Sequence, residues 1–212
     1  CDVFISQAGT KMKQYDLLVL DPAWAYKPSA KLHRQVAAVY KTSKPKDWYD
    51  WDIKGLCQPY ARVWIWTTSP KINECRKLAE AWGLVYTGNQ FFWKKGNSKS
   101  PSPLSFMGQC EFAMCFKLKK SKGWPFKKKT SPGNFLETKA LPHSAKPEQF
   151  QDLLEGMYGT PSELDYCELF ARRYRPGWDC VGNELNGTIE DFLAGVPMNL
   201  RAPPPPVIVA PK

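Results

Sequence analysis

YDLLVL, residues 15–20, runs directly into Asp21-Pro22-Ala23-Trp24. A continuous apolar run of strand length that ends in a turn-forming Asp-Pro predicts a strand buried on both faces of a sheet. Asp21 would then stand at the carboxyl edge of that strand, which is the edge where open α/β sheets bind their ligands. The stretch therefore predicts an α/β fold with a carboxylate at its ligand-binding edge.

Strand and helix patterns alternate along the rest of the chain. Helices are predicted over residues 45–57, 70–82 and 147–158, and further strands over residues 62–67, 84–93, 110–118, 165–171 and 178–181. Gly83 supplies the stop for the second of these helices. Residues 22–44 are predicted to form a long active-site loop and residues 119–134 a basic loop. This alternation is typical of a twisted sheet with helices on its faces.

The length and composition fit one domain. A chain of 212 residues that is 43% hydrophobic can bury one sizeable core. We expect the domain to span residues 1–186, and residues 187–212, which include Pro203 to Pro206, to form an extended proline-rich tail. No apolar stretch approaches the ~20 residues that a membrane-spanning helix needs, and the first residues lack a signal-peptide pattern. The sequence predicts a soluble protein without a membrane partner.

Cysteine and histidine usage argues against disulfides and against a metal site. The seven cysteines are odd in number and form no Cys-x-x-Cys pair, which favours reduced thiols. The two histidines are His33 and His143, so a His/Cys metal site would need ligands scattered over the whole chain. We expect the protein to work without a metal.

Positive charge is concentrated in one segment. The chain carries 30 Lys and Arg against 20 Asp and Glu, and seven lysines lie between Lys117 and Lys129. Because lysines can neutralise phosphates while Trp124 and Phe126 offer rings for stacking, the segment is a candidate nucleic-acid surface. The alternative is a solvated lysine loop without a ligand. The candidate phosphate contacts are Lys119, Lys120, Lys122, Lys127, Lys128 and Lys129.

The piece Asp21-Pro22-Ala23-Trp24 suits the methylation of an amine such as adenine N6. The lone pair of that nitrogen is delocalised into the ring, so the nitrogen is a poor nucleophile until the pair is localised. The Asp21 carboxylate and the Pro22 carbonyl can accept the two amine hydrogens, while Trp24 stacks on the extruded base. The alternative is a turn that ends a strand and has no chemical role.

Seven pieces of the sequence resemble, in the same order, the MT-A70 family of adenine-N6 methyltransferases, which includes bacterial and phage DNA enzymes. The similarity covers residues 1 to about 185. Several pieces in order are more specific than any one of them. The pieces are Cys1-Asp2-Val3, Asp21-Pro-Ala-Trp24, Tyr40-Lys-Thr, Phe92-Trp-Lys94, Pro142-His-Ser-Ala-Lys-Pro147, Glu168-Leu-Phe-Ala-Arg172, and Gly177-Trp178 with Gly182-Asn-Glu184.

The resemblance implies S-adenosylmethionine as the cofactor and a role for most of these residues. It implies that Asp21, Pro22 and Trp24 are catalytic, and that Tyr40 and Lys94 lie at the target pocket. It implies that Lys146 neutralises the methionine carboxylate of the cofactor, a task for which the point charge of an ammonium group suffices. The residues implied to bind the cofactor are Asp2, Val3, Asp21, Lys146, Glu168, Arg172, Asn183 and Glu184.

The order of the pieces implies a Rossmann-like methyltransferase sheet with a permuted motif order. The catalytic Asp-Pro-x-Trp piece comes first, before the strand that carries Glu168, so the absence of a G-x-G-x-x-G turn is expected. Two features depart from the family. Ala23 stands where a second proline is usual, so one fixed backbone angle is lost. Arg173-Tyr174-Arg175 replaces a His-Asn pair of eukaryotic members and is left without a role.

These observations predict an active DNA adenine-N6 methyltransferase in the cytoplasm of a bacterium or of a phage-infected host. Two alternatives stay open. One is a catalytically inert, nucleic-acid-binding member of the same family. Inert members typically lose the aspartate or the cofactor contacts, whereas Asp21, Lys146 and Asn183 are present here. The other is an enzyme that methylates adenine in RNA.

Overall fold

The protein folds around a single seven-stranded sheet. A computed structural model describes residues 12–26, 48–95, 108–127, 130–139, 141 and 145–201. The strand order is β5-β3-β4-β2-β1-β6-β7, and of these seven strands only β4 runs antiparallel to its neighbours. The strands are β1 (Tyr15–Leu20), β2 (Cys57–Thr67), β3 (Leu84–Lys95), β4 (Cys110–Leu118), β5 (Phe135–Thr138), β6 (Tyr166–Leu169) and β7 (Trp178–Val181).

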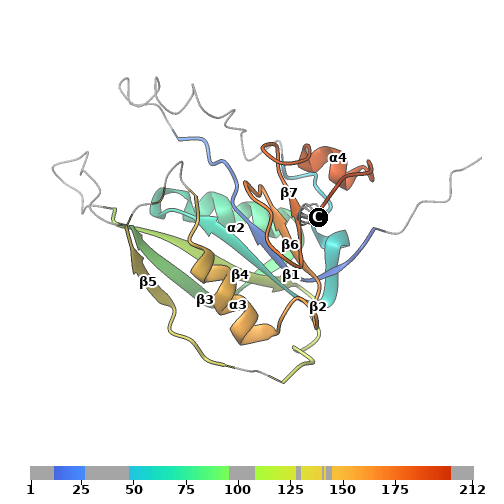
Figure 1. The fold of residues 1–212 in the computed structure, drawn as a ribbon. Coiled ribbons are helices and arrows are strands. Elements are labelled where there is room, and N and C mark those ends of the chain that lie inside the picture. The colour runs from blue at the N-terminus through green and yellow to red at the C-terminus, as the bar shows by residue number, and fades with distance from the viewer. Residues whose placement is uncertain are drawn as a thin grey trace, which may run out of the picture.

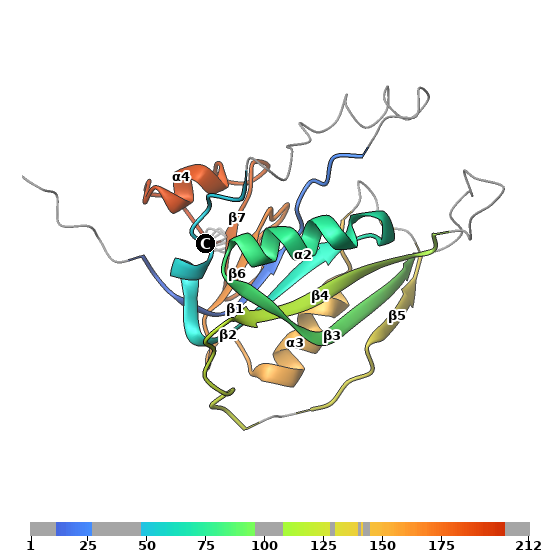
Figure 2. The same ribbon diagram turned by 180° about the vertical axis from the view of Figure 1, so that it is seen from behind.

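Helices cover both faces of this sheet, as predicted (Figures 1 and 2). β1 is buried at all six positions, and its side chains alternate between the two faces. Leu18 and Leu20 pack on the side of α2 (Ile72–Ala81), while Leu17 and Val19 pack on the side of α3 (Glu148–Tyr158). The α/β fold class is therefore confirmed, and both predicted helices over these segments are present.

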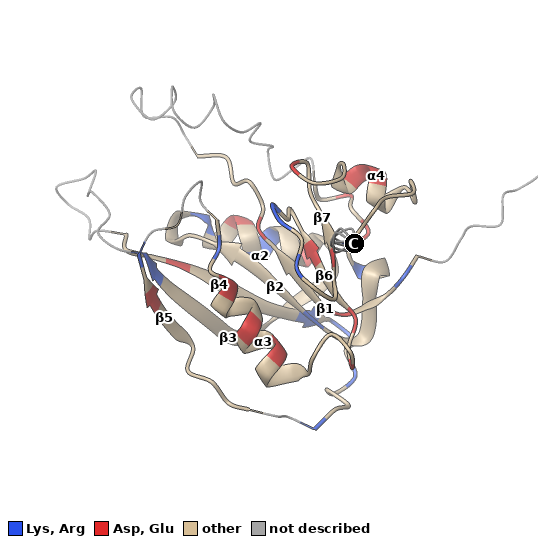
Figure 3. Cartoon of the chain, in the orientation of Figure 1, with Lys and Arg blue, Asp and Glu red and all other residues tan. Residues whose placement is uncertain are grey.

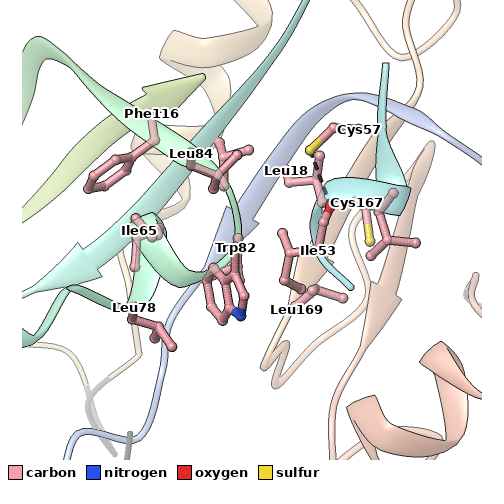
Figure 4. Close-up of a cluster of buried hydrophobic side chains, with 14 of the residues drawn as sticks. Leu18, Ile53, Cys57, Ile65, Leu78, Trp82, Leu84, Phe116, Cys167 and Leu169 are labelled. Atoms are coloured by element: carbon pink, nitrogen blue, oxygen red, sulfur yellow. Dashed lines mark hydrogen bonds between the residues drawn. The ribbon is translucent and has the colours of Figure 1, made fainter. Parts of the chain in front are cut away.

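The core on the α2 side gathers residues from many parts of the chain. Figure 4 shows Leu78 and Trp82 of the α2 region beside Ile65 of β2, with Leu18 of β1 and Leu169 of β6 nearby. Burying a side chain of this size contributes roughly 1.5–3 kcal/mol to stability. Strands far apart in sequence thus share one core, to which α2 and the segment around Ile53 both contribute.

The strand order reverses between the neighbouring parallel strands β1 and β6, which is the topological switch point of the sheet. From β1 the chain passes to β2 on one side, and from β6 it passes to β7 on the other. Ligands of open α/β sheets bind outside the carboxyl ends of the strands at such a switch point. Asp21 follows β1 and Phe170 follows β6 at this edge, which we call the carboxyl edge.

The helix predicted over residues 45–57 is wrong over its described part, residues 48–57. Trp48, Ile53 and Leu56 are buried there, but turns and the short 3₁₀ helix η2 (Lys54–Leu56) lead into β2. The Asp52 carboxylate accepts a hydrogen bond from the backbone N–H of Gly55, 2.9 Å away. Such local side-chain bonds compete with helix formation.

Two further elements differ from the prediction. The strand predicted over residues 165–171 ends at Leu169, because Phe170 adopts a φ of 64° that cannot continue a strand. β5, which pairs with β3, was not predicted at all; it lies just after the predicted basic loop and has only four residues. A strand this short gives little periodic signal.

Residues 187–201 belong to the packed domain, which differs from the extended tail predicted for residues 187–212. They contain α4 (Ile189–Leu193), and Ile189 is only 3% exposed. The carbonyl of Leu200 accepts a hydrogen bond from Cys180 of β7, and Arg201 pairs with the buried Asp179. Residues 202–212, which include Pro203 to Pro206, lie outside the described residues. Across the described ranges, no helix is long and apolar enough to cross a membrane.

Candidate active site at the carboxyl edge

A lysine links two carboxylates at the carboxyl edge. Lys146, just before α3, places its Nζ 2.7 Å from Oδ2 of Asp21 and 3.4 Å from Oε2 of Glu111, near the start of β4. Lys95 at the end of β3 forms a second ion pair with Glu111. The three linked side chains Lys146, Asp21 and Glu111 are 14%, 16% and 13% exposed, so this carboxyl-edge cluster is largely screened from water.

The charges of this cluster stabilise one another. Burial by itself lowers the pKa of Lys146. Asp21 and Glu111 together raise that pKa by more than burial lowers it, so the net pKa lies above the ordinary value. Burial by itself raises the pKa of Glu111, but Lys146 and Lys95 hold it below its usual range. At neutral pH the lysine is therefore a cation and Glu111 is ionised.

Trp24 is buried in the core. Its indole N–H donates to the carbonyl of Trp66 at 2.9 Å, its ring meets that of Trp48 edge-on at 5.9 Å, and it is only 6% exposed. The backbone N–H of Trp24 also donates to the Pro22 carbonyl at 2.8 Å, which leaves that oxygen a second lone pair. Trp24 thus anchors the loop that carries Asp21, and its ring lies away from solvent.

Glu168 lies one strand away from Asp21, on β6. Its carboxylate accepts a hydrogen bond from Gln151 of α3 at 2.6 Å, and Gln151 in turn accepts from Arg173 at 2.9 Å. Burial raises the pKa of Glu168 to about 7; Asp21 raises it as well, whereas Arg173 and Gln151 oppose the rise. Glu168 can therefore change protonation state near neutral pH.

The loops after β6 and β7 approach each other closely at the switch point. Phe170 holds a positive φ, which is rare for a bulky residue and is often found at functional sites. A Cβ atom on Gly182 would lie 2.0 Å from the carbonyl oxygen of Ala171, so this position requires glycine. Arg172 and Glu184 extend from these two loops and approach to 3.8 Å. Asn183 is exposed beside them.

The structure brings some of the predicted site residues together and leaves others apart. Asp21, Lys146, Glu168, Arg172, Asn183 and Glu184 all lie at or next to the carboxyl ends of β1, β6 and β7. Lys94 is the second-last residue of β3 and lies near the same edge, but it pairs with Glu137 of β5 at 2.7 Å. The predicted residues Asp2, Val3, Tyr40, Lys128 and Lys129 lie outside the described residues.

The lysine-rich segment lies at the opposite edge of the sheet from Asp21. It follows β4, the antiparallel strand, so it leaves the sheet at the amino end of β1 and β2. The backbone N–H of Lys122 donates to Pro59 near the start of β2. Lys119, Lys120, Lys122 and Lys127 are exposed there, and Figure 3 shows this segment running below the sheet. Because β1 has six residues, about 20 Å separate the two edges.

Sequence reasoning missed Glu111 and Gln151. Glu111 gives no sequence signal beyond a charge at the start of an apolar strand, and Gln151 is one polar position within a helix, although it is only 3% exposed. The residues left without a role, Arg173 and Arg175, bind α3: Arg173 pairs with Glu148, and Arg175 with Asp152 and Glu155. Within the described ranges, no group of three or more His, Cys, Asp or Glu residues could hold a metal ion.

The fold and the site together define a class of protein. A Rossmann-like α/β sheet with a polar cluster at its switch point is an arrangement of ligand-binding enzymes. The chain belongs to the MT-A70 family, whose model matches residues 15–184. It is also 27% identical over 190 residues to the Type II methyltransferase M.MunI of a Mycoplasma species, an alignment that covers 82% of this chain and 78% of that relative. The resemblance drawn from the sequence pieces is confirmed, and both findings support methyltransferase activity.

Proposed function

We propose that the chain transfers a methyl group from S-adenosylmethionine to N6 of adenine in DNA. The observation that carries the proposal is the Asp21–Lys146 pair at the switch-point edge, in a chain of the MT-A70 family. The relative named as a Type II methyltransferase supports methyl transfer. The choice of adenine in DNA rests on the family resemblance and on the net charge of +10, which favours a polyanionic partner.

The residues at the carboxyl edge fit S-adenosylmethionine. Its methionine carboxylate needs a cation, and Lys146 supplies one that is held in place by two carboxylates. Its amines and ribose hydroxyls need polar partners, which Glu168 and the exposed Asn183 and Glu184 offer beside the tight loop contact at Gly182. When bound, S-adenosylmethionine supplies a methyl group activated by its sulfonium.

The chain's own residues then activate the target amine. One oxygen of Asp21 is held by Lys146, so the other is left to accept one hydrogen from N6, and the second lone pair of the Pro22 carbonyl accepts the other. Accepting both hydrogens favours a pyramidal nitrogen with a localised lone pair. As the C–N bond forms, the bond between the methyl carbon and the sulfonium sulfur would break, and N6 would become positive and give up a proton, for which Asp21 is the adjacent acceptor. Positioning supplies most of the rate enhancement.

A methyl-transfer assay tests the proposal. Labelled S-adenosylmethionine is incubated with the chain and matched DNA and RNA oligonucleotides, and the product nucleosides are separated after digestion. N6-methyladenine from DNA is the expected product. N6-methyladenine from RNA alone would change the substrate class, and oligonucleotide binding without any transfer would identify an inert family member.

We expect a chelator to leave cofactor binding unchanged, because the proposed partners of S-adenosylmethionine are side chains of this chain. Calorimetric titration before and after treatment with EDTA gives the two affinities. Agreement within about twofold is the expected result, well below the tenfold that corresponds to ~1.4 kcal/mol. Loss of binding on chelation would contradict this prediction and would point to a metal in the site.

Neutralising the exposed lysines after β4 is expected to weaken nucleic-acid binding without changing cofactor affinity. Replacing Lys119, Lys120 and Lys122 by glutamine should reduce the slope of log affinity against log salt by up to about 3 on duplex DNA, close to one unit per lost phosphate contact. The effect should be similar for all sequences, because lysines bind phosphates rather than base edges.

A matched triple variant separates local contacts from total charge. Lys54, Lys77 and Lys139 are exposed lysines spread over other parts of the molecule, and their replacement by glutamine removes the same charge. If the scattered variant changes the salt slope as much as the clustered one, total charge is responsible and the surface after β4 has no special role.

A further inference from the structure

We propose that Tyr26, rather than Trp24, is the aromatic platform on which the extruded adenine stacks, an inference that rests on the proposed function. Trp24 is 6% exposed, whereas Tyr26, two residues further along the same loop, is 44% exposed. An aromatic ring can stack on a base only if one of its faces is accessible. The exposed ring next to Asp21 in the described chain is therefore that of Tyr26.

The ring of Tyr26 is held in place by two partners. Its hydroxyl lies 2.7 Å from the hydroxyl of Thr68, just past the carboxyl end of β2. Nζ of Lys71 lies 5.3 Å from the ring centroid, in the geometry of a cation–π contact. Lys71 is itself fixed, because it is buried and pairs with Glu74 at 2.7 Å. A ring held from two sides is preorganised, so little entropy is lost when a base stacks on it.

Tyr26 also lies within electrostatic reach of the carboxyl-edge cluster. Burial raises the pKa of its hydroxyl and the bond to Thr68 lowers it, while Glu111, Lys146 and Asp21 each contribute through their charges. Charges act on a hydroxyl in this way only when they are near it. Thr68, which bonds Tyr26, stands two residues after Trp66, whose ring centroid lies 5.6 Å from Nζ of Lys146, so this contact places Tyr26 beside the cluster.

The arrangement divides the two aromatic residues of the loop between two tasks. Trp24 points into the core and fixes the backbone of Pro22 and Asp21 through its bond to Trp66. Tyr26 faces outward, where it can receive the base and hold N6 toward Asp21. Tyr26 is thus a residue that touches the substrate, and Trp24 is a positioning residue.

The test first maps the adenine that the wild-type chain methylates in a DNA oligonucleotide and replaces it by 2-aminopurine. Stacking on a tyrosine quenches the fluorescence of this base, so the Tyr26→Leu complex is expected to be brighter than the wild-type complex. Methylation of the natural oligonucleotide should fall by about 5- to 150-fold in kcat/KM, as expected for the loss of one base–aromatic stack. Tyr26→Phe keeps the ring and should stay within about threefold.

Phe135 supplies a matched control. It is an exposed aromatic residue, 55% exposed, but it lies on the edge strand β5, four strands away from β1. Phe135→Leu should leave the 2-aminopurine signal of the bound oligonucleotide unchanged. Calorimetric binding of S-adenosylmethionine should be equal in all variants, which shows that each one is folded.

The outcomes separate this inference from the proposed function. A wild-type chain that methylates no adenine overturns the proposed function and this inference with it. A wild-type chain that methylates adenine, together with a Tyr26→Leu variant of equal rate and equal fluorescence, overturns the inference alone.

Discussion

Replacing Asp21 by asparagine is expected to slow methyl transfer by about 10³-fold or more, as expected for removal of a group that acts at the reacting centre. Lys146 donates to one oxygen of Asp21 at 2.7 Å, so in the variant the amide oxygen would take that place. The amide NH₂ would then face the target amine, and a donor would meet a donor. Initial rates at saturating DNA measure the loss, and Asp21→Ala should behave alike.

Cofactor affinity of the Asp21 variants should stay within about tenfold, or ~1.4 kcal/mol, since the main role of Asp21 is at the target amine. Asp16→Asn is the matched control: it makes the same substitution near the amino end of β1, where the Asp16 carboxylate accepts a hydrogen bond from the backbone N–H of Asp165. Its turnover per folded molecule should equal that of the wild type. Turnover of Asp21→Asn within tenfold of the wild type would refute the catalytic assignment.

Replacing Lys146 by methionine is expected to lower the free energy of unfolding by about 3–5 kcal/mol, because a buried charge cluster loses its central cation. Asp21 and Glu111 would face each other across the vacated position, with Lys95 left as a partner of Glu111. Cofactor affinity should fall by about 100-fold, the effect of losing one charge-assisted contact worth ~3 kcal/mol. Urea unfolding and calorimetry measure the two effects.

The stability effect should depend on pH with a defined sign. The folded-state pKa of Glu111 lies below its ordinary value of 4.5, so its contribution is present above that pH and is lost as the pH falls through the lowered pKa. The gap between wild type and Lys146→Met should therefore narrow below pH 4.5. Lys94→Met is the control, since Lys94 pairs with Glu137 at the same 2.7 Å but is 32% exposed. Its cost should stay below about 1 kcal/mol. Equal losses for the two variants would contradict this account.

The fold could be predicted wherever apolar periodicity was strong. The run YDLLVL and the positions from Ile72 to Trp82 gave a strand and a helix that the structure contains. Residues 48–57 could not be assigned correctly, because Trp48, Ile53 and Leu56 bury themselves in turns that mimic helical spacing. Phe170 shortened β6 through a backbone angle that nothing in its residue type predicts.

The family pieces named Asp21 and Lys146, which the structure brings together in one ion pair, while their roles stay predictions. The edge of the sheet at which a segment lies, amino or carboxyl, could not be predicted, because it depends on the direction of the preceding strand. The lysines after β4 lie away from Asp21 only because β4 runs antiparallel, and that follows from pairing with β2 and β3 rather than from local sequence. The exposure of individual side chains could not be predicted either: Trp24 and Tyr26 stand two residues apart, but Trp24 is buried and Tyr26 is exposed.

The position of β1 in the sheet also bears on the order in which the protein folds. β1 lies between β2 and β6, and the contact between Asp16 and Asp165 joins residues 149 positions apart. Contacts of such long separation close late, since the entropy of a long loop is lost before the contact can reward it. β1, the strand that delivers Asp21, comes early in the sequence. It gains its second neighbouring strand last, when β6 docks against it. We therefore expect recognition of the cofactor to appear only in the final folding phase, after the earlier pairing of β2, β3 and β4.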